Sequence, residues 1–162
     1  MNRSDVLALL KSRGIPFELV EHKAVYNMAD LAEIALPHPE ADAKNLFVRD
    51  DKGQSFYLIT VKGEKRVDLK AFRHAHGTRP LSFASDEELA ALLALTPGSV
   101  TPLGLLNDET RRVALFIDEA QLEDDGLIAV HPNDNTATVW LKTADLITLL
   151  RERGHFVETT RL

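Results

Sequence analysis

The sequence contains no cysteine among its 162 residues. Without thiols, the chain cannot form a disulfide, a thiolate metal site or a cysteine nucleophile. No stretch approaches the roughly 20 consecutive apolar residues that a membrane-spanning helix needs, and residues 1–5 lack the apolar run of a secretory signal. We therefore expect a soluble, cytoplasmic protein with no membrane contact.

Standard catalytic signatures are also missing. The sequence has no nucleophile elbow, no phosphate-binding loop, no dinucleotide fingerprint and no HExxH motif. Of its six histidines, only His74 and His76 are close together, and side chains two residues apart on a helix point to different sides. We expect neither a metal ion nor a cofactor.

Positive charge is scarce and unevenly placed. The formal net charge of −6 argues against a non-specific grip on nucleic acid. Residues 62–79, however, hold six Lys or Arg and two acidic residues, a net of +4. This composition suits either local contact with a phosphate backbone or an ordinary solvated helix and turn. The candidate contacts are Lys62, Lys65, Arg66, Lys70 and Arg73.

Capping residues and apolar spacing predict five helices. The first runs from a Ser4 cap to Gly14, and the second from an Asn27 cap to about Leu36. The remaining three run from Asp68 to Gly77, from a capping box of Ser85 and Glu88 onward, and from a Thr143 cap to Gly154.

Short β-rich runs lie between these helices. They cover residues 17–21, 45–49, 56–61, 112–117, 127–130, 137–141 and 156–158, and turns at 51–53 and 133–135 predict two hairpins. The length and a composition of 44% hydrophobic and 27% charged residues fit one domain over residues 1–162. We predict an α+β (mixed α/β) fold, with one mixed, mostly antiparallel sheet and flanking helices.

A lysine begins one of the predicted strands. By strand alternation, Lys44 lies on the same face as Leu46 and Val48. A lysine on an apolar face needs an anion, an acceptor or an exit to solvent. Lys44 is therefore either a site residue or a lysine at a strand end whose charged head reaches water.

The stretch 97–104 is neither helical nor strand-periodic. Gly98 permits positive φ and close backbone approach, and Pro102 restricts the far end of the stretch. Such a loop can present successive N–H groups to a carbonyl oxygen or an oxyanion. An ordinary connection between a helix and a strand is the alternative.

A histidine stands directly after another predicted strand. His131 follows the apolar run 127–130, and residues at strand ends often form sites on a rigid scaffold. A turn rich in Asn and Asp is the structural alternative. That alternative accounts for residues 133–135 better than for His131.

Five segments together resemble a known family. They are residues 44–47, 65–69, 81–85, 98–102 and 131–138. In this order they resemble the YbaK/prolyl-tRNA synthetase editing-domain superfamily, and more specifically the free-standing prolyl-tRNA deacylases of the PrdX or ProXp-ala type. Residues 98–102 fit the GxxxP loop of that family. The resemblance covers nearly the whole chain and implies the family's mixed sheet with flanking helices.

The resemblance implies hydrolysis of the ester that joins a wrong amino acid to the terminal adenosine of tRNA, in the first place alanine on tRNA(Pro). It places the family's lysine at Lys44, its loop glycine at Gly98 and its histidine at His131. The implied partners are the acceptor end of tRNA(Pro) and, transiently, prolyl-tRNA synthetase or an elongation factor. The candidate substrate contacts are Asn45, Gly98, Ser99, Val100, Thr101 and Pro102.

An aminoacyl ester is already activated, so a placed water and a home for the oxyanion suffice. Lys44 would hold the terminal phosphate or ribose, and amides near Gly98 would hold the carbonyl oxygen. Either His131 or the substrate's 2′-hydroxyl would move the proton, and we favour the 2′-hydroxyl. Two alternatives stay open: a non-catalytic RNA- or partner-binding module, and a deacylase for another small mischarge such as Cys-tRNA(Pro).

Overall fold

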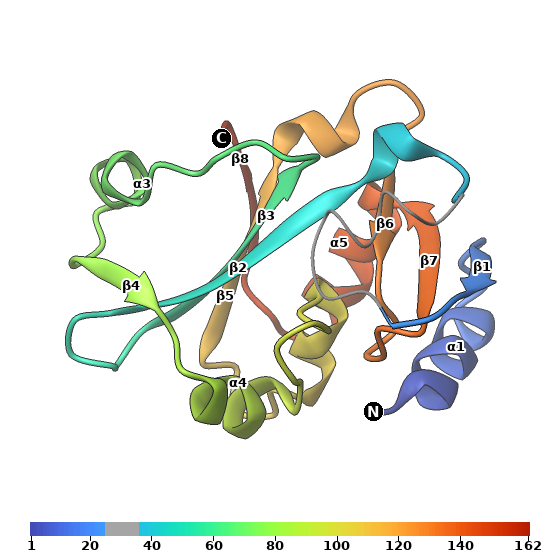
Figure 1. The fold of residues 1–162 in the computed structure, drawn as a ribbon, viewed down its shortest axis with the longest axis horizontal. Helices are drawn as coiled ribbons and strands as arrows, with labels where there is room; N and C mark the ends of the chain where they lie inside the picture. The colour runs from blue at the N-terminus through green and yellow to red at the C-terminus, as the bar shows by residue number, and fades with distance from the viewer. Residues whose placement is uncertain (25–35) are drawn as a thin grey trace.

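The computed structural model describes residues 1–24 and 36–162, which form two β-sheets with helices around them (Figure 1). The smaller sheet is antiparallel, in the order β1–β7–β6 (Glu18–Glu21, Ala137–Lys142, Leu127–Val130). The larger sheet has the order β4–β2–β3–β5–β8 (Leu81–Phe83, Ala43–Asp50, Phe56–Lys62, Val113–Asp118, Val157–Thr160). In it, β2 is antiparallel to β4 and β3, whereas β5 is parallel to β3 and β8.

Four α-helices and three 3₁₀ helices complete the described part of the chain. They are α1 (Arg3–Ser12), η1 (Pro39–Ala41), α3 (Leu69–His76), α4 (Asp86–Leu93), η2 (Pro102–Asn107), η3 (Glu119–Leu122) and α5 (Thr143–Glu152). The predicted caps Asp68 and Ser85 are confirmed, and Gly77 ends α3 at φ 66°. The helix predicted from Asn27 lies outside the described residues.

Two helix starts differ from the prediction. Asn2, and not Ser4, caps α1, because Asp5 completes a reciprocal capping box with it. Thr143 is the first helical residue of α5 rather than its cap. Its hydroxyl instead donates to the buried backbone carbonyl of Gln121 at 3.0 Å, and a carbonyl in that position needs a donor.

A shared apolar core joins the two sheets. Ile128 and Val139 from the smaller sheet and Leu58 and Leu115 from the larger one belong to a single buried cluster. Helix α5 contacts both β7 and β8, so it packs against both sheets. The relative position of the sheets, and of any site between them, is therefore fixed by hydrophobic burial.

The other face of the larger sheet carries a smaller cluster under α3. Phe72 of α3 packs edge-on against Phe116 of β5 with ring centroids 5.0 Å apart. His76 lies on both rings, whereas His74 is exposed, which confirms that the two histidines point to different sides. Within the described residues, no helix has the length and apolarity to cross a bilayer.

The prediction of a single sheet is wrong, while both predicted hairpins are confirmed. The turn at 51–53 joins β2 to β3, and the turn at 133–135 joins β6 to β7. Alternation identifies strands but does not say which strands pair, so a second sheet could not be distinguished. Strand β4, with three residues, is too short to give a periodic signal.

Candidate functional site

Asn45, near the start of β2, reaches from the larger sheet to the 98–102 loop. Its Nδ2 lies 3.3 Å from the carbonyl oxygen of Val100, and the Thr60 hydroxyl lies 2.6 Å from its Oδ1. A carbonyl oxygen only accepts, so the amide must turn its NH₂ to Val100 and its oxygen to Thr60. Asn45 thus connects β3, β2 and the loop through one hydrogen-bond chain.

Hydroxyl groups hold the loop in place. Ser99 is buried, and its Oγ donates to the Thr96 carbonyl at 3.0 Å while it accepts from the Thr96 N–H at 3.2 Å. The Thr101 hydroxyl donates to the His131 carbonyl at 2.8 Å and accepts from the Leu103 N–H at 3.3 Å. Both hydroxyls hold the loop itself, so neither is arranged as a nucleophile.

The loop backbone has donors to offer. Gly98 adopts φ +43°, the positive φ that its position predicts. Pro102 begins η2, so the far end of the loop is fixed by a helix start. Within residues 1–24 and 36–162, no acceptor faces the backbone N–H of Gly98 or Val100. Two N–H groups two residues apart can serve a carbonyl oxygen that gains negative charge.

His131 lies directly after β6, as predicted, and is tied to the loop through its own carbonyl. Its Nδ1 is 2.9 Å from the carbonyl oxygen of Ala137. Burial lowers the pKa of His131 below the ordinary value, and nearby His22 lowers it further. The Ala137 hydrogen bond and the Asp134 carboxylate oppose this pKa shift without cancelling it. His131 is therefore neutral near pH 7.

Lys44 does not join this group in the structure. It pairs with Val61 across the β2–β3 ladder, on the face of β2 opposite to that of Asn45. Its side chain is half-buried on the Leu46 face and has no hydrogen-bond or ion-pair partner among the described residues. The structure thus unites Asn45, the loop and His131, and leaves Lys44 at the same strand end with its ammonium available.

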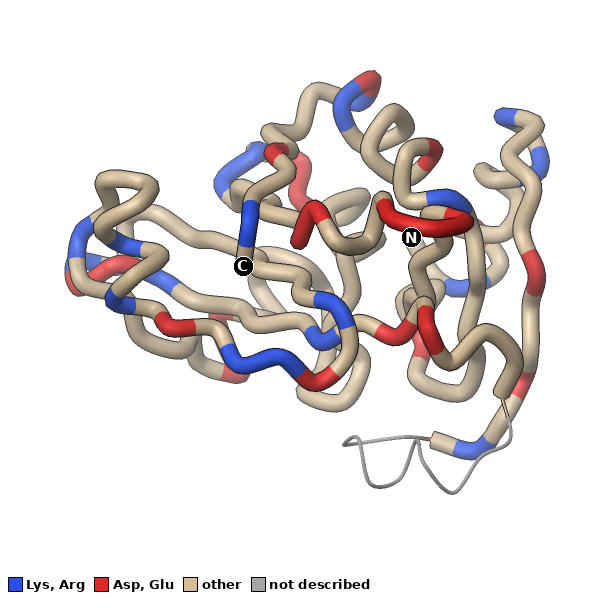
Figure 2. The backbone as a smooth tube through the Cα atoms, turned by 90° about the horizontal axis from the view of Figure 1, so that it is seen from above, with Lys and Arg blue, Asp and Glu red and all other residues tan. Residues whose placement is uncertain are grey.

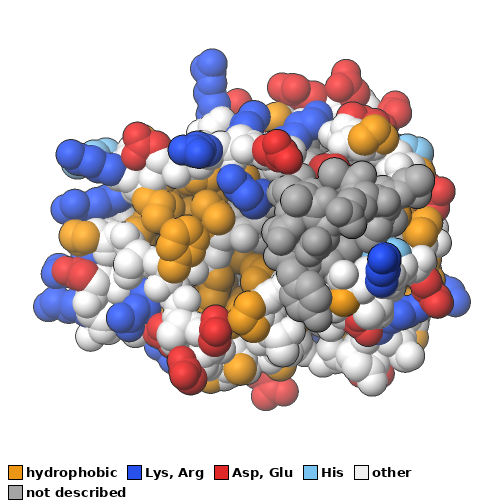
Figure 3. Space-filling model, viewed as in Figure 1, with side chains coloured by type: hydrophobic (Ala, Val, Ile, Leu, Met, Phe, Trp, Pro, Cys, Tyr) orange, Lys and Arg blue, Asp and Glu red, His pale blue; other side chains and the backbone are white. Residues whose placement is uncertain are grey.

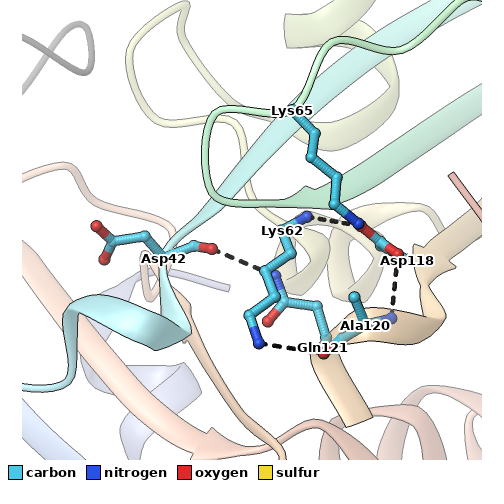
Figure 4. Close-up of polar contacts among 6 residues, drawn as sticks. All are labelled: Asp42, Lys62, Lys65, Asp118, Ala120 and Gln121. Atoms are coloured by element: carbon cyan, nitrogen blue, oxygen red, sulfur yellow. Dashed lines mark hydrogen bonds and ion pairs between the residues drawn. The ribbon is translucent and has the colours of Figure 1, made fainter. Parts of the chain in front are cut away.

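The basic segment divides into two groups. Lys62 and Lys65 turn inward, toward β5 and η3 (Figure 4). Lys65 pairs with Asp118 at 2.9 Å, and Lys62 donates its Nζ to the Ala120 carbonyl at 3.3 Å and its backbone N–H to Asp118 at 3.1 Å. Burial acts to raise the pKa of Asp118. Lys65 and the backbone N–H groups of Lys62 and Ala120 outweigh burial, so the pKa is lowered.

The outward-facing group consists of Arg66, Lys70 and Arg73. Arg66 and Lys70 are exposed, Arg73 is half-buried, and none has an acidic partner among the described residues. Figure 2 shows Lys and Arg gathered at the end of the molecule that carries α3. Figure 3 shows basic side chains along that end beside a patch of hydrophobic side chains. This surface is chemically suited to a phosphate backbone.

Sequence reasoning missed three residues around the site. Thr60 supports Asn45, His22 lies beside His131, and Thr138 bonds to His22. His22 follows β1 as His131 follows β6, so the same strand-end signal could have found it. Thr60 and Thr138 carry no such signal, because their partners are distant in sequence. The described parts of the chain contain no group of three or more His, Asp or Glu placed to hold a metal ion.

Comparisons with known proteins identify the family of the chain. The family model of the aminoacyl-tRNA editing domain matches residues 22–149. The prolyl-tRNA editing protein ProX of Acetoanaerobium sticklandii is 38% identical over 157 residues, which cover 97% of this chain and 95% of that protein. The prolyl-tRNA synthetase associated domain-containing protein 1 of Bos taurus is 31% identical over 153 residues, which cover 90% and 86%.

The fold is also found in solved structures. One of them, described provisionally as a trans-editing enzyme for prolyl tRNA synthetase, superposes with a TM-score of 0.73 at 23% identity, covering 99% of this chain and 96% of that one. The matched family range contains Asn45, the loop, His131 and the basic segment. Editing is the hydrolysis of a wrongly formed aminoacyl ester, and this chain belongs to the aminoacyl-tRNA editing domain family as an aminoacyl-tRNA deacylase.

Proposed function

We propose that the chain is a trans-editing hydrolase that removes alanine from mischarged tRNA(Pro). The observation that carries this proposal is the loop 98–102, held between Asn45 and His131 with backbone N–H groups available. The similarity to ProX, a prolyl-tRNA editing protein, supports tRNA(Pro) as the substrate. A transient partner, either prolyl-tRNA synthetase or an elongation factor, would deliver or receive this tRNA, and the reaction would take place in the cytoplasm.

The loop backbone would bind the reacting carbonyl. In the transition state, the carbonyl oxygen of the ester gains negative charge, and the N–H groups of Gly98 and Val100 would hold it. One such donor is worth about a hundredfold to a thousandfold in kcat in enzymes where it has been removed. The hydroxyls of Ser99 and Thr101 and the ring of Pro102 keep the loop in this shape. A narrow pocket formed by the loop would admit alanine and exclude the larger proline ring.

Proton movement would involve the substrate itself. The Nδ1 of His131 faces the Ala137 carbonyl, so its Nε2 is left for the substrate. We propose that this nitrogen accepts a hydrogen bond from the 2′-hydroxyl of the terminal ribose. Water would add to the carbonyl carbon and the bond to the 3′-oxygen would break, while the 2′-hydroxyl relays the proton that the water loses to the leaving 3′-oxygen. No protein nucleophile is then needed.

Cations would place the rest of the tRNA. Lys44, near the start of β2, would bind the phosphate or ribose of the terminal adenosine. The exposed cations Arg66, Lys70 and Arg73 would contact the acceptor stem. Lys62 and Lys65 would contribute chiefly by holding the segment against Asp118 and η3.

A panel of mischarged tRNAs tests the proposed function. Purified protein should deacylate Ala-tRNA(Pro) and leave Pro-tRNA(Pro) intact, because the pocket wall excludes the proline ring. The measurement is release of labelled amino acid in single-turnover reactions with Ala-, Cys- and Pro-tRNA(Pro) and with Ala-tRNA(Ala). Preference for Cys-tRNA(Pro) would change the substrate assignment. Tight binding of tRNA without hydrolysis of any ester would make the chain a binding module.

Removing the Lys44 charge should slow deacylation. Loss of a charge-assisted hydrogen bond costs about 1.5–3 kcal/mol, which corresponds to a loss of about tenfold to hundredfold in kcat/KM. Lys44→Ala and Lys44→Met should lose equal amounts, since Lys44→Met keeps the apolar stem on its strand face. The check is kcat/KM on Ala-tRNA(Pro), with circular dichroism as the folding control. Near-normal turnover of both folded variants would remove Lys44 from the site.

Charge reversal of the outward-facing group should weaken tRNA binding. The triple variant Arg66→Glu, Lys70→Glu, Arg73→Glu should raise KM more than it lowers kcat, because phosphate contacts position the substrate. It should also flatten the salt dependence of binding, by about 0.9 in log–log slope for each duplex phosphate that the variant no longer neutralises. Lys65 stays unchanged in this variant, since its reversal would place a carboxylate against buried Asp118.

A matched control separates the surface from net charge. The control carries three reversals outside residues 62–79, at Lys11, Lys142 and Arg153, with the same change in net charge. Binding of tRNA(Pro) by both triple variants is measured across a salt series. An equal loss of tRNA(Pro) affinity in the two variants would mean that tRNA contacts another surface.

A further inference from the structure

His22 lies beside the proposed site but has no part in the mechanism above. It follows β1, and its backbone N–H donates to the Thr136 carbonyl at 2.9 Å, one step beyond the Glu21–Ala137 pair of the β1–β7 ladder. Its ring centroid is 6.3 Å from that of His131, with the planes tilted by 59°. The sheet therefore places two imidazoles next to each other, one at the end of β1 and one at the end of β6.

Hydrogen-bond partners fix the protons of both rings. Carbonyl oxygens only accept, so the Nδ1 of His131 must donate to Ala137, 2.9 Å away, and the Nδ1 of His22 must donate to Lys23, 2.7 Å away. The Nε2 of neutral His22 is then an acceptor, and the Thr138 hydroxyl, at 2.7 Å, donates to it. Thr138 is buried in β7, one residue after Ala137.

Both ring nitrogens of His22 are thus occupied by the protein. A proton taken up at Nε2 would reverse the bond to Thr138, because the hydroxyl can also accept, and the nitrogen would still face Thr138 rather than the substrate. His131 differs, since its Nε2 has no partner among the described residues. The two histidines therefore have different roles: His131 offers a nitrogen to the substrate, while His22 is anchored on two sides as a rigid neighbour.

We infer that His22, held by Thr138, is a positioning residue that fixes the His131 ring with its Nε2 turned toward the substrate. The inference rests on the proposed function, because it assigns His131 a substrate contact. Thr138 and Ala137 are consecutive in β7, so this strand orients both rings: Ala137 through its carbonyl and Thr138 through its hydroxyl. Loss of His22 would leave the His131 ring held by the Ala137 bond alone.

A double-mutant cycle tests the coupling. His22→Ala should lower kcat about tenfold with little change in KM, a loss that corresponds to about 1.4 kcal/mol. The same change in a His131→Ala background should cost nothing more, because His22 acts only through His131. The measurement is single-turnover deacylation of Ala-tRNA(Pro) by the four proteins. Equal losses in the two backgrounds would overturn the inference.

A second pair of variants covers a failure of His22→Ala to fold. Thr138→Val removes the hydroxyl that holds His22, whereas Thr138→Ser keeps it. Thr138→Val should lower kcat in the same direction as His22→Ala, and Thr138→Ser should stay near the wild-type rate. Equal rates for Thr138→Val and Thr138→Ser would contradict the inference.

Imidazole nitrogen NMR gives a readout that does not depend on activity. In the wild-type protein, His131 should show one sharp set of imidazole signals for a ring with its proton on Nδ1, and His22→Ala or Thr138→Val should broaden these signals, because the ring is then held by the Ala137 bond alone. Equally sharp His131 imidazole signals in both variants would also overturn the inference. Failure of the proposed function is distinguishable, because the wild-type protein would then release no amino acid from any mischarged tRNA while the NMR result still decides the coupling of the two rings.

Discussion

The side-chain amide of Asn45 fixes the loop on which the rest of the site depends. It accepts from Thr60 and donates to the Val100 carbonyl, so its orientation is set by the chemistry of its partners. Loss of this amide would leave the part-buried Val100 carbonyl without its donor, at a cost below the roughly 1–3 kcal/mol of a fully buried group. The backbone donors of the loop are useful only while this contact and the Thr101 bond hold the loop still.

The two sheets have different tasks around this loop. The larger sheet supplies Asn45 from β2, and the smaller one supplies His131 from the end of β6. The common core and α5 hold the two sheets in a fixed relative position. The opposite face of the larger sheet carries α3 and the outward-facing cations. Buried Asp118 holds the start of that basic segment through Lys65. The proposed tRNA contacts and the proposed reaction site thus lie on opposite faces of one strand pair, β2 and β3.

Local features were predictable because their causes are local. The positive φ of Gly98, the Asp68 and Ser85 caps and the two hairpin turns each depend on a few neighbouring residues. The positions of Lys44, the loop and His131 came from family resemblance, since no single motif identifies them. The structure adds that Lys44 and Asn45, adjacent in sequence, face opposite sides of β2.

Long-range pairing was not predictable in the same way. Lys65 and Asp118 are 53 residues apart, and Thr60 and Asn45 meet only because β2 and β3 pair in one register. The division into two sheets depends on which strands become neighbours, which alternation does not encode. The Asn2 cap was missed because Ser4 is also a good cap, and only the Asp5 side chain decides between them.

Binding of the reacting carbonyl by the 98–102 loop, beside His131, can be observed in a complex with an analogue that does not react. A crystal structure with 3′-alanylamino-adenosine, whose amide resists hydrolysis, tests this directly. We expect the carbonyl oxygen within hydrogen-bond distance of the Gly98 and Val100 N–H groups, and the 2′-hydroxyl at the Nε2 of His131. An analogue bound with its carbonyl away from this loop, or with its ribose away from His131, would rule out this binding mode.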